Sequence, residues 1–458
     1  MYHKTFAKKL WSCIIIITLL LCSISLITTS AAETEVTLQY TIAKNQAAIT
    51  GYTGNPVHIE IPAEIDGYPV TAIGYKAFGW CDSLKSVLLP ETITTIGDWA
   101  FKQCMNLESI NLPEGLEYIG SSAFLLCKKV AEFNIPSTVE HIGVQAFSDC
   151  KMIKSIVIPE GITIISDGLF SHCNNLKTVT LPESLETIGS DAFMFCENLE
   201  EINFPANLKE IGYRAFSRCK VLKDFTIPEK LTVIEGSSFE YTALESVVIP
   251  KSVTVIESNA FSNCTKLRKV VLNSNVTRYE RGIFSGCTSL RYIELPDNVQ
   301  MFDDRLFSGC ESLINIDLPE NLGNAGINGF DNCSSLRCIA IPDNYCINGL
   351  RKTDFDDCNN LSVVILRGSG VHYKKAYFYN YEIKNMGCDI IFSDTAKGIG
   401  DADMDGDINI KDATLIQKHT ALLYTLKQDE LLLSDFNGDE SVNIKDATSV
   451  QKYIAEVL

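Results

Sequence analysis

Apolar and polar residues alternate along most of the chain in a unit that repeats about every 23 residues. In the copy that begins at Leu107, Ile110 and Leu112 are apolar and their neighbours are polar, which predicts a short half-buried strand. Pro113 would end that strand because proline has no N–H for the ladder. A phenylalanine marks each of 13 copies: Phe78, Phe101, Phe124, Phe147, Phe170, Phe193, Phe216, Phe239, Phe261, Phe284, Phe307, Phe330 and Phe355.

A fixed period of this length predicts a repeat solenoid, in which each turn buries its apolar face against the neighbouring turns. We expect about 13 turns with parallel β-structure on one face over residues 63–366, an N-terminal cap at 33–62, and a C-terminal cap and linker at 367–397. The outward strand positions, which run from Ser86 to Asn315 and from Leu88 to Asp317, are mostly small and polar. They supply one aromatic residue, Tyr292, so this face favours a protein ligand over a glycan, and the alternative is a solvated face that binds no ligand.

Cysteine follows the same repeat. Twelve of the 17 cysteines occupy one slot: Cys81, Cys104, Cys127, Cys150, Cys173, Cys196, Cys219, Cys264, Cys287, Cys310, Cys333 and Cys358. Strand spacing in a stacked solenoid would permit disulfides between neighbouring turns. Thr242 stands in the slot in one copy, which favours small buried thiols instead.

The repeated pattern L-x-x-I-x-I-P-x-x-V-x-x-I-G-x-x-A-F-x-x-C resembles the BspA-like leucine-rich repeat of bacterial surface proteins. The stretch from Ala48 to Phe78 is similar to the N-terminal segment of that family. The resemblance covers residues 36–366 and implies extracellular adhesion or recognition without specifying a ligand.

The N-terminus predicts export. Lys4, Lys8 and Lys9 precede an apolar run, and Ser30-Ala31-Ala32 resembles a cleavage site, so residues 1–32 are interpreted as a signal peptide. The alternative is a membrane anchor, but three serines dilute the run. The rest of the sequence holds no segment suited to span a bilayer. The formal charge of −18 disfavours nucleic acid and anionic membranes as partners.

Two acidic loops near the C-terminus repeat one ligand pattern. Oxygen-bearing residues stand at positions 1, 3, 5, 7, 9 and 12, the spacing of an EF-hand-type calcium loop. Two calcium ions are therefore expected. Position 6 is Gly406 in the first loop but Glu440 in the second, which predicts a distorted or weaker second site. The candidate ligands are Asp401, Asp403, Asp405, Asp407, Asn409, Asp412, Asp435, Asn437, Asp439, Ser441, Asn443 and Asp446.

Each loop runs directly into a segment with one apolar helical face, and no helix is expected before either loop. The faces comprise Ala413, Ile416, Thr420 and Leu423 in the first copy and Ala447, Val450, Ile454 and Val457 in the second. This duplicated loop-helix unit, at residues 398–458, resembles a type I dockerin, a small all-α calcium-binding module. The resemblance implies docking to a cohesin module of a scaffoldin. At the positions where dockerins contact cohesin, the resemblance places Ile410, Lys411, Gln417 and Lys418 in the first copy and Ile444, Lys445, Gln451 and Lys452 in the second.

Many dockerins carry Ser-Thr where both copies here carry Ile-Lys, so the cohesin class is left open. Identical residues in the two copies mean that either helix could dock. Calcium would coordinate carboxylates that otherwise repel each other. Because the hydrophobic core of this module is small, its folding should depend on the metal.

No catalytic motif is recognised in the sequence. The six histidines are scattered, and no nucleophile, zinc or phosphate-loop pattern appears. The favoured interpretation is a secreted non-catalytic recognition or adhesion protein, placed at the cell surface or in a cellulosome-like complex by its dockerin. The alternative is an accessory or cryptic hydrolase acting in polysaccharide breakdown within that complex.

Overall fold

The computed structural model describes residues 36–273, 275–326, 328–342, 352–367, 387–393, 395–396, 398–439 and 441–457. The proposed signal peptide, most of the proposed C-terminal cap, Cys346 and Glu440 lie outside these ranges. Within them, no helix is both long enough and apolar enough to cross a membrane.

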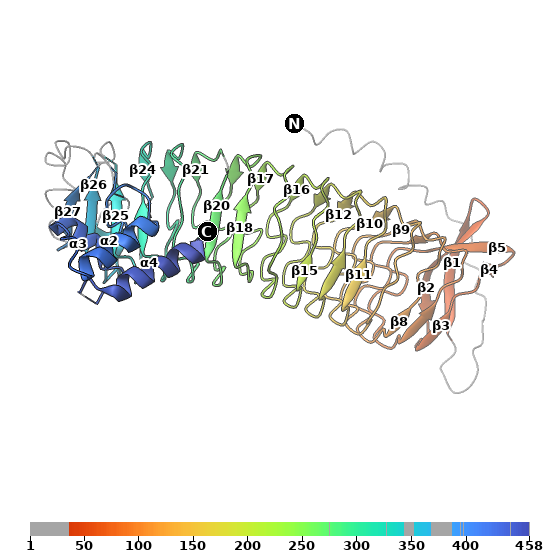
Figure 1. Ribbon diagram of the computed structural model, residues 1–458. Helices are drawn as coiled ribbons and strands as arrows, with labels where there is room; N and C mark the ends of the chain where they lie inside the picture. The colour runs from red at the N-terminus through yellow and green to blue at the C-terminus, as the bar shows by residue number, and fades with distance from the viewer. Residues whose placement is uncertain are drawn as a thin grey trace.

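The repeats wind into an elongated solenoid whose turns stack side by side along one axis (Figure 1). In most turns the segment before the repeat proline forms a strand of the first parallel ladder, which is divided into four sheets. Strands from successive turns pair in register, as Ser155 does with Thr178. This ladder comprises β3 (His58–Glu60), β6 (Ser86–Leu88), β8 (Ser109–Ile110), β11 (Ser155–Val157), β13 (Thr178–Thr180), β15 (Glu201–Ile202), β18 (Ser246–Ile249), β20 (Lys269–Leu272), β23 (Asn315–Asp317), β25 (Cys338–Ile341), β26 (Val363–Leu366) and β27 (Asp389–Phe392).

A second parallel ladder follows each proline, mostly with two residues per strand. The predicted parallel sheet on one face is confirmed. The second ladder was not predicted, and it forms because the isoleucine before the repeat glycine pairs through its backbone with the same residue of the next turn. The strands are β5 (Tyr68–Ile73), β7 (Thr95–Ile96), β9 (Tyr118–Ile119), β10 (His141–Ile142), β12 (Ile164–Ile165), β14 (Thr187–Ile188), β16 (Glu210–Ile211), β17 (Val233–Ile234), β19 (Val255–Ile256), β21 (Arg278–Tyr279), β22 (Met301–Phe302) and β24 (Asn324–Ala325).

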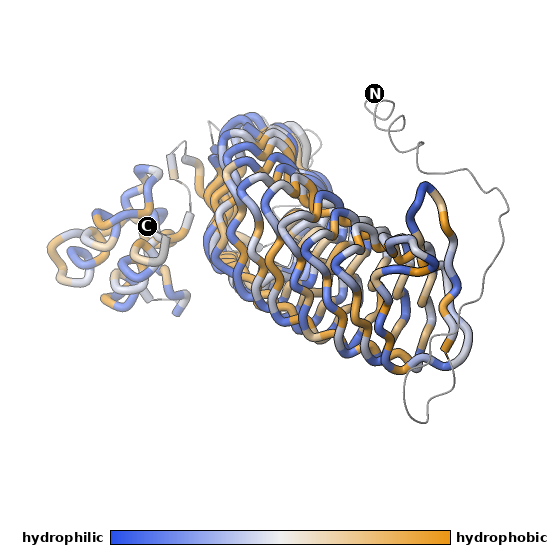
Figure 2. The backbone as a smooth tube through the Cα atoms, turned by 90° about the vertical axis from the view of Figure 1, so that its right-hand side faces the viewer, coloured by the Kyte–Doolittle hydropathy of each residue, from blue (hydrophilic) through white to orange (hydrophobic). Residues whose placement is uncertain are grey.

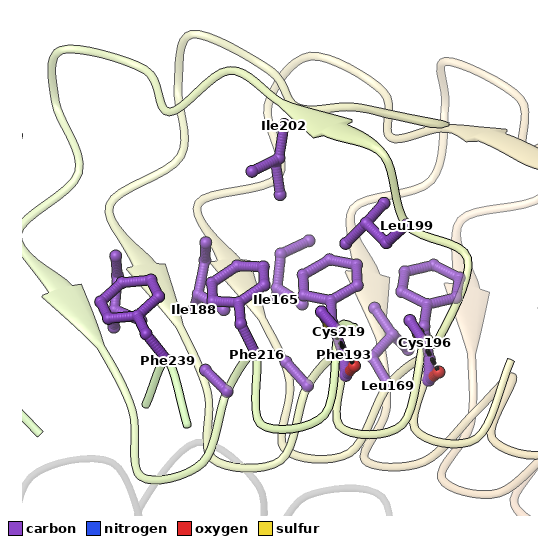
Figure 3. Close-up of a cluster of buried hydrophobic side chains, with 14 of the residues drawn as sticks. Ile165, Leu169, Ile188, Phe193, Cys196, Leu199, Ile202, Phe216, Cys219 and Phe239 are labelled. Carbon is purple, nitrogen blue, oxygen red and sulfur yellow. Dashed lines mark hydrogen bonds between the residues drawn. The ribbon is translucent and has the colours of Figure 1, made fainter. Parts of the chain in front are cut away.

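The third side of each turn, here called the turn side, consists of tight turns around the repeat phenylalanine. These phenylalanines form a continuous stack, from Phe78–Phe101 with ring centroids 5.3 Å apart to Phe330–Phe355 at 5.5 Å. Figure 3 shows Phe193, Phe216 and Phe239 lying face to face in this stack. The apolar residues of the turns are buried, and hydrophobic and hydrophilic positions alternate along each turn of the chain (Figure 2).

The slot cysteines are buried free thiols beside this stack. Cys196 Sγ donates a hydrogen bond to the carbonyl oxygen of Phe170, one turn back, at 3.1 Å. Cys219 repeats the contact with Phe193 at 3.3 Å. From Cys104 onward each slot thiol therefore donates to a backbone carbonyl of the preceding turn, whereas the threonine in the slot bonds within its own turn. Thr242 Oγ1 donates to the carbonyl of Phe239 at 2.9 Å.

An antiparallel hairpin covers the N-terminal end of the core. Strand β1 (Thr37–Ala43) pairs with β2 (Gln46–Thr53), and β2 joins the second ladder by pairing with β5. The short strand β4 (Glu64–Ile65) also pairs with β5. Tyr52 stacks on Phe78 at 5.6 Å and so ends the phenylalanine stack.

The C-terminal residues form three short helices beside the last strands of the first ladder (Figure 1). They are α2 (Ile410–Thr420), α3 (Gln428–Ser434) and α4 (Ile444–Val457), and a 3-10 turn, η3 (Lys352–Phe355), precedes the last repeat cysteine. The two-part fold predicted from the sequence is confirmed. The expectation that no helix precedes either acidic loop is wrong for the second loop, because α3 ends at Ser434, next to Asp435.

Candidate calcium centre and docking face

The first acidic loop already has the shape of a coordination loop. Asp412 Oδ2 accepts a hydrogen bond from the N–H of Asn409 at 2.7 Å, and its Oδ1 accepts from the N–H of Asp403 at 3.2 Å. Asp401 Oδ2 accepts from the N–H of Gly406 at 3.2 Å. Gly406 has a φ of +94°, which glycine adopts without steric cost and which lets the chain reverse at position 6.

The second loop repeats this arrangement. Asp446 accepts from the N–H of Asn437 at 3.0 Å and from the N–H of Asn443 at 2.8 Å. Asp435 Oδ1 accepts from the N–H of Gly438 at 2.9 Å. The aspartate at position 12 thus ties the start of the loop to the start of the following helix in both copies.

Carboxylate oxygens gather at both loops. One oxygen each from Asp401, Asp403 and Asp405 lie within 4.8 Å of one another. In the second loop the same holds for Asp435, Asp439 and Asp446. The remaining candidate ligands lie on the same two loops.

The donor set fits calcium, because it consists of hard oxygens on alternate loop positions. Asp401, Asp412 and Asp446 are fully buried. Burial, helped by the neighbouring carboxylates of Asp403 and Asp401, raises the pKa of Asp412 to about 6, although the backbone N–H groups of Asn409 and Asp403 act in the opposite direction. Buried carboxylates held this close need a compensating positive charge, which a divalent cation would supply.

The two loop-exit helices pack against each other. Ala413 and Ile416 on α2 and Ala447 and Val450 on α4 are fully buried, as the apolar spacing predicts. The expectation for Leu423 is wrong: α2 ends at Thr420, and Leu423 is 80% exposed. The chain turns there with Leu422 at a φ of +58°, so the helical spacing no longer applies.

The eight residues proposed to meet a cohesin lie on α2 and α4 and remain accessible. Ile410 is 57% exposed and Ile444 is 55% exposed. Gln417 is half-buried, and the other lysine and glutamine residues of the set are exposed. Lys411 and Lys452 also line clefts between the helices and the solenoid.

The helical module is packed against the outward face of the first ladder. The side chain of Asn315 on β23 donates to the carbonyl of Ile399 at 2.8 Å and accepts from its N–H at 3.2 Å. Tyr292 meets Tyr453 of α4 edge-on at 5.8 Å. The expectation that these strand positions face solvent is therefore wrong at this end of the solenoid, where Asn315 is 3% exposed.

A signal for this packing exists in the sequence but was missed. Beyond Asn315 and Asp317 the outward columns become apolar, with Cys338 and Ala340 on β25 and Val363 and Ile365 on β26. These side chains are buried together with Ile399, Ala413 and Phe436 of the module. An apolar outward face at the last turns predicts a covering element.

Comparison with known proteins agrees with both parts of the fold. The model of the BspA type leucine-rich repeat region matches residues 55–177, 141–268 and 280–402, and the model of the dockerin type I domain matches residues 399–455. A leucine-rich repeat protein from Bacteroides ovatus is 29% identical, with a TM-score of 0.65, over 80% of this chain and 100% of that chain. A leucine-rich cell surface protein from Faecalibacterium prausnitzii is 29% identical, with a TM-score of 0.52, over 74% of this chain and 95% of that chain.

The comparison with curated proteins gave no match. A type I dockerin implies calcium binding and a cohesin partner in a cellulosome-type complex, and leucine-rich repeats imply interaction with other proteins. The chain belongs to the BspA type leucine-rich repeat family and carries a type I dockerin domain at its C-terminal end.

Proposed function

We propose that this chain is an exported, non-catalytic recognition protein whose calcium-loaded dockerin attaches it to a scaffoldin cohesin. In this proposal residues 1–32 direct export, residues 33–62 cap the solenoid, residues 63–366 form the recognition solenoid, residues 367–397 cap and link it, and residues 398–458 form the dockerin. The observation that carries the proposal is the equivalent exposure of Ile410 and Ile444. An isoleucine more than half exposed at the first position of each loop-exit helix suits a contact with a partner.

Two calcium ions would be held by the twelve loop residues, Asp401, Asp403, Asp405, Asp407, Asn409 and Asp412 and Asp435, Asn437, Asp439, Ser441, Asn443 and Asp446. A bound calcium ion supplies positive charge that offsets the repulsion among these carboxylates. The chain's own part is to orient the helices. Asp412 accepts a hydrogen bond from the N–H of Asn409, and Asp446 accepts one from the N–H of Asn443. Each bond fixes the end of the loop relative to the first turn of the helix that follows.

The docking face would consist of Ile410, Lys411, Gln417 and Lys418 on α2 or Ile444, Lys445, Gln451 and Lys452 on α4. Because the two sets carry the same residue types on packed, equivalent helices, one cohesin could dock on either set. The exposed lysines suit an acidic rim on the partner, and the isoleucine suits an apolar centre.

Cohesin binding of four variants of the full chain tests the proposal. Ile410→Asp alone and Ile444→Asp alone should each leave binding within about threefold, since the other face remains. The double variant should lose about 100-fold or more, because a charge in an apolar contact centre is desolvated without a partner. Gln428→Asp, at an exposed position on α3, serves as the matched control and should bind normally.

Cohesins of several classes should be screened first with calcium and then with a chelator. Binding that persists without calcium, or a double variant that binds like the unaltered chain, would contradict the proposed docking mode.

A further inference from the structure

The turn side of the solenoid repeatedly holds residues in a left-handed backbone conformation. In each of the 13 repeats the residue two positions after the phenylalanine has a positive φ, from Trp80 at +62° to Asp357 at +63°. In the first 12 repeats the residue two positions before it also has a positive φ, from Lys76 at +57° to Asn328 at +59°. Glycine and asparagine adopt this conformation at least cost, whereas bulky side chains are rare there.

At the position two after the phenylalanine, the turns from Asn263 to Asn332 follow this preference and the earlier turns do not. Asn263, Gly286, Gly309 and Asn332 occupy the position after the phenylalanine in the C-terminal half. In the N-terminal half, that position holds Trp80, and the position before the phenylalanine holds Trp99. Two indoles thus stand at positions where turns of the C-terminal half use asparagine or glycine, such as Asn263 and Gly286 for Trp80 and Asn259 and Gly282 for Trp99.

The two indoles lie in one exposed cluster with Tyr75 and two lysines, here called the aromatic–lysine platform. Trp99 lies 5.8 Å from the ring of Tyr75 and 6.0 Å from that of Trp80. Tyr75 is 59% exposed and Trp80 is 47% exposed. Lys76 Nζ lies 4.5 Å from the centre of the Trp99 ring, and Lys102 Nζ lies 3.9 Å from it.

The backbone under the platform is fixed before any ligand arrives. The N–H of Lys76 donates to the carbonyl of Asp98 at 3.1 Å, and the N–H of Trp80 donates to that of Lys102 at 2.7 Å. The carboxylate of Asp98 accepts from the N–H of Ser121 at 2.7 Å. Because these turns are already ordered, a ligand that binds the rings loses little free energy to ordering of the backbone.

A similar alternation of aromatic and cationic groups recurs farther along the same side. His172 stacks on Phe195 at 4.5 Å, and the guanidinium of Arg218 lies 5.3 Å from the Phe195 ring and 4.4 Å from the Tyr241 ring. These four residues occupy the same repeat position as Trp80, so they lie along the solenoid axis. A line of rings and cations suits an extended polymer better than a compact ligand.

We propose that the aromatic–lysine platform binds a polysaccharide chain that carries carboxylate groups, as uronic acid sugars do. The exposed rings of Tyr75 and Trp80 offer apolar faces to the C–H faces of sugar rings. Lys76 and Lys102 place two positive charges beside these rings, on a chain whose formal charge is −18, and they pair with the carboxylates. The same lysines repel cationic ligands. The inference names a ligand class for the recognition role proposed above and rests on that role, but it does not depend on cohesin binding.

The test is binding of the full chain, with calcium and without any cohesin, to polygalacturonate and to a neutral β-glucan by affinity electrophoresis. We expect retardation by polygalacturonate that weakens with salt and is at least tenfold stronger than that by the neutral polymer. Trp80→Asn introduces the residue that other turns use at this position, so the fold should tolerate it, and we expect at least a tenfold loss of binding. Lys76→Gln combined with Lys102→Ser, residue types found in equivalent positions at Gln145 and Ser148, should abolish the preference for the acidic polymer.

Tyr213→Ser is the matched control, because Tyr213 occupies the repeat position of Tyr75, is 46% exposed and lies against a cation, Arg214. It should bind polygalacturonate as the unaltered chain does. The proposal is overturned if neither polysaccharide binds, if the neutral polymer binds equally well, or if Trp80→Asn binds normally with an unchanged unfolding temperature. If polysaccharide binding fails, cohesin binding should still be observed. If only cohesin binding is lost, polysaccharide binding should be unchanged.

Discussion

Arg337 of the solenoid and Asp435 of the second calcium loop are joined by a hydrogen bond of 2.7 Å from the guanidinium Nη1 to the backbone carbonyl. The Nη2 atom lies 3.5 Å from the carboxylate of Asp435, and Nη1 also donates to the carbonyl of Phe436 at 3.2 Å. Asp435 stands at position 1 of that loop. Arg337 of the solenoid therefore binds the dockerin at the first residue of its second calcium loop.

Replacing Arg337 by glutamine should remove these contacts with the second calcium loop. Hydrogen bonds to charged groups contribute about 1.5–3 kcal/mol each in partly buried settings, so the module's stability should fall by about that amount. Guanidinium titration of the helical circular dichroism signal, with calcium present, measures the change. Arg268→Gln is the control, because Arg268 occupies the same repeat position three turns earlier and is exposed. Equal effects of the two substitutions would show that the contact contributes nothing.

Calcium removal should unfold the helices and leave the solenoid intact. The module's own core is small, and its buried carboxylates, such as Asp412 and Asp446, repel their neighbours without a cation. A chelator should therefore abolish most helical signal at 222 nm while the solenoid's thermal transition persists. Asp412→Asn and Asp446→Asn should each reduce the calcium stoichiometry by one ion, measured by calorimetric titration. A helical signal that survives chelation would contradict metal-linked folding.

The repeat was predictable from the sequence because its signals are local and redundant. Each copy carries an apolar strand, a proline and a phenylalanine, and the period alone fixes how the turns stack. The second ladder was harder to foresee, since two-residue strands such as Thr95–Ile96 show too little alternation to identify. Their pairing is a consequence of stacking rather than of local propensity.

The calcium loops were equally predictable, because ligand spacing is a property of contiguous residues. The packing of the dockerin on the solenoid was not, since it joins Asn315 to Ile399 across 84 positions. The aromatic–lysine platform was missed for a different reason. Alternation along the strands points to the strand columns, whereas Trp80 and Trp99 lie on the turn side at left-handed positions that a strand pattern does not reveal.

The slot cysteines should be unreactive in the folded protein. Burial raises the pKa of the Cys104 thiol to about 12, so very little thiolate is present at neutral pH. We expect the thiol reagent DTNB at pH 8 to modify Cys104 and the other fully buried repeat cysteines at least 100-fold more slowly in native protein than in 6 M guanidinium. Tryptic mapping after a short pulse should leave the peptide that contains Cys104 unlabelled. Rapid native labelling of that peptide, or disulfides between neighbouring turns after non-reducing digestion, would contradict the free buried thiols.

Glu235 should make the solenoid more stable in mild acid than in base. Partial burial, with the nearby carboxylate of Glu257 as the next cause, raises the pKa of Glu235 from 4.5 to about 7. The folded state then disfavours the ionised form, so this side chain lowers stability above pH 7, and the cost disappears as the pH falls from 7 towards 4.5. Glu235→Gln should therefore stabilise the protein at pH 8 by up to about 1 kcal/mol, a figure reduced because the side chain is partly exposed. At pH 5 most of the gain should be lost, as measured by thermal unfolding at both pH values. The exposed Glu229→Gln serves as control, and an equal gain at pH 5 and pH 8 would exclude ionisation of Glu235 as the cause.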